Sequence, residues 1–115
     1  MKELEEVMNQ LQGQNQQLQG IVSQKQTYML QMHELEKALE HLAGVKDQKV
    51  YRAVGPLIIE AGKDEVKKEL EENREDVDLR IKTLETQEEK IKKKLKENQK
   101  KLEDLAGSYR DGQGG

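Results

Sequence analysis

The side chains that could do acid–base or metal chemistry form no pattern that builds a catalytic or metal site. The two histidines, His33 and His41, lie eight residues apart, and neither has a neighbouring set of metal ligands. The many glutamates fit a charged helix surface, because acid–base catalysis needs carboxylates held in a pocket. Gly55-Pro56 lacks the glycine spacing and the Lys-Ser/Thr pair of a phosphate loop. We therefore predict no enzyme, no catalytic residue, no metal and no cofactor.

One segment stands out by its charge. The run Lys90–Lys101 contains seven lysines and a single acid, Glu97. The favoured interpretation is a solvated helix face. The alternative is an electrostatic attraction to an acidic partner, which salt would screen.

Composition excludes several classes of protein. The chain has no cysteine, so it has no disulfide framework, and this fits a reducing cytoplasm. No secretory signal is expected after the charged start Met1–Glu6. No apolar run approaches the roughly eighteen residues of a membrane helix. The net charge of -3 argues against a general nucleic-acid binder. We predict a cytoplasmic protein with neither membrane nor nucleic acid as partner.

The elements that carry these side chains are long helices. Apolar residues make up only 33% of the 115 residues, and Phe and Trp are absent, which is too little apolar volume for a conventional globular core. Such a profile suits helices that bury one narrow seam, whereas disorder is the alternative for a chain this charged. The periodicity decides against disorder.

A seven-residue repeat runs from Leu4 to Leu42 and predicts a coiled-coil helix over residues 2–44. Ten of its twelve seam positions are apolar. Position a reads Leu4, Leu11, Leu18, Lys25, Met32 and Leu39, and position d reads Val7, Gln14, Ile21, Tyr28, Leu35 and Leu42. Gly13 and Gly20 should each cost about 1 kcal/mol relative to Ala in a helix interior. Gly44, a residue suited to a left-handed position, should end the helix.

A second repeat predicts a helix over residues 64–106, with Asp64 as its N-cap. Eight of its eleven seam positions are apolar. Position d reads Leu70, Val77, Leu84, Ile91, Asn98 and Leu105, and position a reads Arg74, Ile81, Glu88, Leu95 and Leu102. We expect residues 107–115 to form a flexible tail.

Residues 45–63 lose the heptad and predict a β-hairpin. Two runs rich in β-branched residues, Lys49–Val54 and Leu57–Glu60, flank Gly55-Pro56. Pro56 has no amide hydrogen, so it belongs at the turn or on an edge. An isolated hairpin is marginal in water, so this one needs a partner, most simply the same hairpin of another subunit.

The expected fold is therefore mainly α, a long antiparallel coiled-coil helical hairpin with one short β-hairpin between its helices. If facing positions sum to 109, every a residue of one helix meets a d residue of the other, and no layer holds two polar residues. Lys25 and Glu88 then lie one turn apart across the seam and can pair.

The two termini meet at the far tip in this arrangement. The tip residues are Leu4, Val7, Met8, Leu11, Leu102, Leu105 and Tyr109. They are either ordinary last layers of the seam or a partly open apolar tip that grips other chains.

The hairpin string Val50-Tyr51-Arg52-Ala53-Val54-Gly55-Pro56-Leu57-Ile58-Ile59, followed by a charged helix, resembles the prefoldin family, particularly its archaeal beta subunits. Gln24-Lys25-Gln26 and Gln87-Glu88-Glu89-Lys90-Ile91 are also similar to the family. Pro56 departs from the family pattern. The resemblance implies a single domain over residues 1–115. A single hairpin is the beta-type layout, since alpha-type subunits have two.

The resemblance implies an ATP-independent chaperone, a hexamer of two alpha-type and four beta-type subunits that passes unfolded clients to a group II chaperonin. It assigns subunit assembly to Val50, Tyr51, Val54, Leu57, Ile58 and Ile59, and client binding to the tip residues. The alternative is a structural or tethering coiled coil that oligomerises through its β insert.

Overall fold

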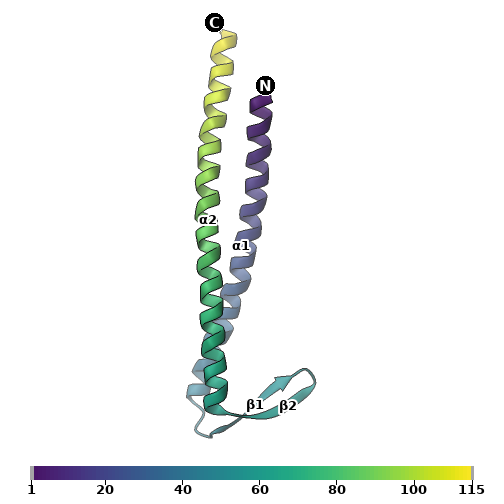
Figure 1. Ribbon diagram of the computed structural model, residues 1–115, viewed down its shortest axis with the longest axis vertical. Coiled ribbons are helices and arrows are strands. Elements are labelled where there is room, and N and C mark those ends of the chain that lie inside the picture. Colours follow the sequence, from purple (N-terminus) through teal and green to yellow (C-terminus); the bar gives the residue numbers. More distant parts are fainter. Residues whose placement is uncertain (1, 115) are drawn as a thin grey trace. The chain divides into compact units, whose positions relative to one another are not determined.

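The computed structural model describes residues 2–114, with side chains described up to residue 108. It contains helix α1 (Lys2–Ala43), strands β1 (Lys49–Val54) and β2 (Leu57–Gly62), and helix α2 (Lys63–Gly114) (Figure 1). The two strands pair antiparallel in a two-stranded sheet. A long helix before the β-hairpin in the sequence and another after it confirm the predicted fold class.

Helix α1 ends where the sequence predicts, but by a different device. The amide of Gly44 donates to the carbonyl of His41 at 3.1 Å, and the amide of Val45 donates to that of Leu42 at 3.1 Å. These bonds span three residues, so they tighten the last turn. Among the described residues only Gly55 has a positive φ, so the expected left-handed Gly44 is wrong.

Helix α2 begins directly after β2 and is longer than predicted. Asp64 lies within its first turn, so it is not the N-cap. The amide of Lys63 donates to the carbonyl of Gln48 at 2.8 Å, which extends the strand pairing into the start of the helix. At the other end the helix continues to Gly114, where a tail was expected from residue 107. No proline follows Leu105, and each added helical residue gains a backbone hydrogen bond.

Residue contacts divide the structure into two compact units. The terminal unit contains the chain up to Lys25 and from Thr83 onward, and the hairpin unit contains Gln26–Lys82. Each unit holds a segment of α1 and an antiparallel segment of α2, so each has a seam of its own.

The seams follow the predicted heptads. The buried apolar side chains are Val7, Leu84 and Leu95 in the terminal unit and Leu42 and Val77 in the hairpin unit. All five occupy predicted a or d positions, and the other predicted seam residues are half-buried, except Arg74, which is exposed. A long arginine can keep its charged head in water while its stem covers the seam. Burial along one narrow stripe is what a two-helix coiled coil provides.

Candidate functional site

The β-hairpin is built on a two-residue turn. Gly55 has a φ of +59°, and the strands pair up to Val54 opposite Leu57. A positive φ at the first central residue and the fixed negative φ of Pro56 at the second match a type II′ turn, which suits the twist of two antiparallel strands. Pro56 therefore lies at the turn, as predicted, and the strand pairing is continuous on both sides of it.

One face of this hairpin is partly covered and the other is open. Val50, Arg52 and Ala61 share the partly covered face and are half-buried. On the opposite face Tyr51 and Ile58 are exposed by 69% and 76%. Val54, Leu57 and Ile59 share the face of Val50, nearer the turn, and are exposed as well. Five of the six predicted assembly residues are thus exposed, and only Val50 is half-buried.

A charged clamp joins strand β1 to helix α2 within the hairpin unit. The guanidinium of Arg52 donates to both carboxylate oxygens of Glu69, at 2.8 and 3.1 Å. Such two-pronged pairs are directional, so the clamp restricts the rotation of β1 against the helix. The ammonium of Lys63 also donates to the carbonyl of Val45, which connects the start of α2 to the segment between α1 and β1. No repeat or motif in the sequence predicts either contact.

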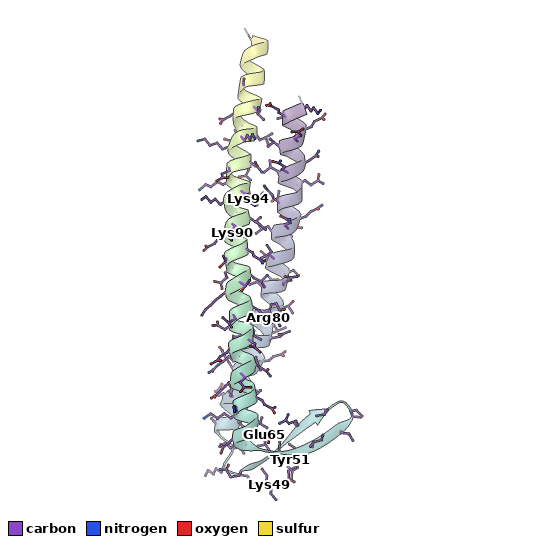
Figure 2. The ribbon with its side chains drawn as sticks, viewed as in Figure 1. Lys49, Tyr51, Glu65, Arg80, Lys90 and Lys94 are labelled. Carbon is purple, nitrogen blue, oxygen red and sulfur yellow. The ribbon has the colours of Figure 1, made fainter. Side chains whose placement is uncertain are left out.

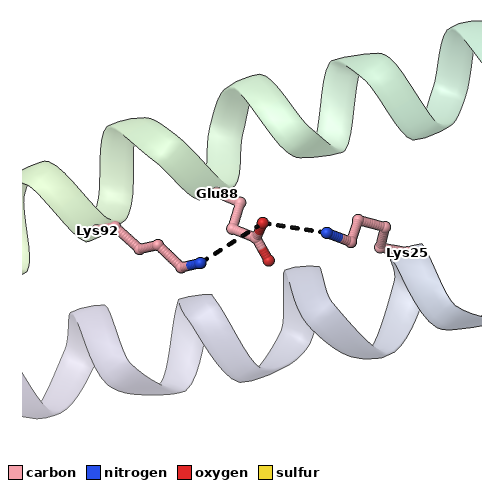
Figure 3. A network of polar contacts seen from close by, with 3 residues as sticks. All are labelled: Lys25, Glu88 and Lys92. Carbon is pink, nitrogen blue, oxygen red and sulfur yellow. Dashed lines mark hydrogen bonds and ion pairs between the residues drawn. The ribbon is translucent and has the colours of Figure 1, made fainter.

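The terminal unit contains a polar network within its seam (Figure 3). The ammonium of Lys25 donates to the Glu88 carboxylate at 3.1 Å, and that of Lys92 lies 3.8 Å from the same oxygen. The side chains of Lys25 and Glu88 are only 22% and 13% exposed. The hydrogen bond from Lys25 holds the pKa of Glu88 below its usual value, and both lysine charges act in the same direction against the effect of burial. The pairing predicted from the register is confirmed.

Two further polar contacts of the seams were not predicted. The amide of Asn98 donates to the side-chain oxygen of Gln14 at 3.0 Å, which joins polar residues of neighbouring layers. In the hairpin unit the guanidinium of Arg80 lies 5.6 Å from the centre of the Tyr28 ring and donates to its hydroxyl at 3.2 Å. The bond between Asn98 and Gln14 satisfies polar atoms of the half-buried seam, whereas the contact between Arg80 and Tyr28 lies at its exposed edge.

The predicted tip residues differ in accessibility. Val7 is 3% exposed and belongs to the seam, whereas Met8 beside it is 54% exposed. The remaining described members are half-buried: Leu4, Leu11, Leu102 and Leu105. Tyr109 lies outside the residues whose side chains are described. The tip therefore offers Met8 and the rims of four half-buried leucines to another molecule.

The described part of the chain holds neither a group of metal ligands nor a helix that could span a membrane. Its histidine, aspartate and glutamate side chains form no cluster of three or more that could hold a metal ion. Neither α1 nor α2 combines the length and apolarity needed to cross a membrane, as judged over the described residues.

Comparison with known proteins identifies the family. The family model described as Prefoldin subunit matches residues 5–109. The chain belongs to the prefoldin family. The prefoldin beta subunit of Archaeoglobus fulgidus is 39% identical over 104 residues, 90% of each chain. The beta subunit of Thermococcus kodakarensis is 40% identical over 89 residues, 76% of each chain.

The solved prefoldin structures agree with the sequence relatives. The crystal structure of the prefoldin beta subunit from Thermococcus strain KS-1 superposes with a TM-score of 0.86 at 36% identity, and the match covers 91% of this chain and 93% of that one. The beta2 subunit of the same strain gives a TM-score of 0.69 at 28% identity. The chain is thus of the beta type, and the resemblance noted in the hairpin string is confirmed.

Proposed function

We propose that this prefoldin-family chain is the beta-type subunit of an ATP-independent holdase that binds unfolded proteins and delivers them to a group II chaperonin. The observation that supports this most is the similarity to archaeal beta subunits over nine-tenths of the chain, which includes the hairpin and both helices. We further propose that it works in the cytoplasm and by contact alone, without catalysis or a cofactor.

The hairpin is the proposed assembly device. It carries five exposed apolar side chains and two open strand edges. Such edges and patches are the usual places where another β-strand adds. We propose that the hairpin pairs with those of an alpha-type subunit and of further beta subunits.

The tip is the proposed client-binding surface. Unfolded proteins expose apolar side chains, and an accessible methionine is a flexible, adaptable contact for them. Met8 is the most accessible apolar member of the described tip residues.

A light-scattering assay of a denatured client tests the proposal. The chain, assembled with an alpha-type partner, should suppress aggregation without ATP, and Met8→Glu should weaken this protection several-fold because a charge opposes apolar contact. Met29→Glu is the matched control, since Met29 is 52% exposed on α1 outside the tip. Full protection by Met8→Glu and by a tip-truncated chain would refute the tip assignment. A chain that assembles with its partner but does not suppress client aggregation would instead support the alternative of a structural or tethering coiled coil.

A further inference from the structure

A shallow groove runs between the two helices of the terminal unit, away from the tip residues. It is lined by Gln17, Gly20, Ile21 and Gln24 of α1 and by Gln87, Lys90, Ile91 and Lys94 of α2. The half-buried Ile21 and Ile91 supply its apolar surface, and glutamines and lysines form the rest. The groove thus combines a narrow apolar strip with hydrogen-bonding side chains and positive charge.

The two lysines of this groove have no acidic partner among the described residues. Lys90 and Lys94 form no ion pair among the described residues. The facing part of α1 has no charged residue from Val7 to Gln24. On α2 the nearby Glu88 is held by Lys25 and Lys92, and Glu97 makes no ion pair with Lys94 among the described residues. An anionic ligand would therefore meet two free ammonium groups.

The glycine on the α1 side keeps the groove open. A Cβ built on Gly20 meets no atom within 4 Å, so neither packing within the chain nor a positive φ requires a glycine there. A larger side chain at this position would extend into the groove instead.

The spacing of the two lysines suits an extended chain. Lys90 and Lys94 lie one turn apart on α2 (Figure 2), which is about 6 Å along the helix axis. Alternate side chains of an extended strand recur at about 6.7 Å on one face. Two acidic residues at positions i and i+2 of an extended segment therefore match the two ammonium groups, and the glutamine side chains can bond to its backbone.

We propose that this groove binds extended segments of unfolded proteins in which acidic residues alternate with apolar ones. The inference rests on the proposed chaperone function and adds a client class and a lateral site to it. The charge of the groove complements acidic segments, which an apolar tip alone would hold poorly. Nucleic acid is a poorer fit, because the groove has no aromatic side chain on which bases could stack.

Photo-crosslinking of peptides to the full chain tests the proposal. The first probe is a short peptide of alternating Glu and Val with a crosslinker at its centre, and the second has Gln in place of Glu. The acidic peptide should crosslink to α1 around Gly20 and to α2 around Ile91, and fluorescence anisotropy should show tighter binding of it than of the Gln peptide. Crosslinks confined to the tip, or equal affinity for both peptides, would overturn the proposal.

Two matched pairs of variants locate the interaction. Lys90→Gln with Lys94→Gln should weaken binding of the acidic peptide roughly three- to tenfold and reduce its salt dependence, as expected for two partly exposed ion pairs. Lys96→Gln with Lys100→Gln removes the same charge at the same spacing outside the groove and should have little effect. An equal loss in both pairs would indicate a diffuse field and refute the groove.

The glycine offers a variant that leaves the charge unchanged. Gly20→Leu should fill the groove and lower peptide affinity, whereas Gly13→Leu, at the same heptad position and equally open, should not. Displacement of the peptide by a single-stranded DNA oligonucleotide that binds more tightly would contradict the peptide assignment. Aggregation assays separate the groove proposal from the chaperone proposal. If the variant with Lys90→Gln and Lys94→Gln binds the acidic peptide as tightly as the unmodified chain and still protects clients from aggregation, only the groove proposal fails.

Discussion

Glu88 accepts contacts from both Lys25 and Lys92 within the seam of the terminal unit, so its charge state should affect the stability of the fold. Its pKa is lowered from the ordinary value of 4.5, chiefly by the hydrogen bond from Lys25. A carboxyl with a depressed pKa in the folded state stabilises that state above its unfolded pKa, and this contribution disappears as the pH falls through the folded pKa. The stabilisation should be complete at neutral pH, and it should decline as the pH falls below about 4.5 and through the lowered pKa of Glu88.

Glu88→Gln should therefore lower the melting temperature at pH 7 relative to the unmodified chain, and this difference should shrink as the pH falls below about 4.5. Circular dichroism melts across this pH range measure the difference. Glu89→Gln is the control, because the neighbouring Glu89 is exposed and forms no ion pair among the described residues. A gap between Glu88→Gln and the unmodified chain that stays constant from pH 7 to pH 3 would contradict the linkage.

Arg52 tests how the hairpin is held. Arg52→Lys keeps the charge but loses the two-pronged contact with Glu69, so amide hydrogen exchange in β1 should become faster. Both side chains are about a third or more exposed, so global stability should fall by less than about 1 kcal/mol. Lys49→Gln breaks the looser pair with Glu60, at 3.5 Å, and should leave this exchange unchanged. If amide hydrogen exchange in β1 is equally fast in Arg52→Lys and Lys49→Gln, the contact between Arg52 and Glu69 does not hold the strand in place.

At the scale of the elements, the two glycines of α1 lower the stability of the helix in the terminal unit. Gly13 and Gly20 have space for a Cβ and no positive φ. Gly13→Ala and Gly20→Ala should each raise the free energy of unfolding by up to about 1 kcal/mol, from helix propensity alone. Gly55→Ala should do the opposite, since its φ of +59° strains a residue with a Cβ. Chemical denaturation of the three variants measures this, and a destabilising Gly13→Ala would mean that the glycine serves a packing role.

The elements themselves were predictable because their signals are periodic and local. Heptads placed the seam residues, β-branched runs around Gly55-Pro56 placed the hairpin, and the register arithmetic placed Lys25 near Glu88. The contact between Arg52 and Glu69 was not predictable, because it depends on how the hairpin twists against α2, which no repeat encodes. The bond between Gln14 and Asn98 likewise depends on side-chain rotamers across neighbouring layers. The burial of Val7 and the exposure of Met8 beside it follow the heptad, in which Val7 holds a d position and Met8 lies outside the seam.

At the scale of the whole molecule, the surfaces proposed for assembly and for client binding belong to different units of the chain. The hairpin unit carries the exposed apolar strands, whereas the terminal unit carries the tip and the basic groove. Most of the strongly exposed large apolar side chains of the hairpin unit lie on the hairpin itself. Assembly should therefore depend on the strands and little on the outward surface of the helices.

Ile58→Glu tests this dependence. Ile58 is 76% exposed on the open face of the hairpin, so a charge there should leave the isolated fold intact and prevent burial of this face against another subunit, because a buried unpaired charge is strongly unfavourable. Native mass spectrometry with an alpha-type partner should then show free subunits in place of the complex. Leu30→Glu is the matched control, since Leu30 is 60% exposed on α1 and should not affect assembly. A complex that forms normally with Ile58→Glu and fails with Leu30→Glu would move the assembly surface from the strands to the helices.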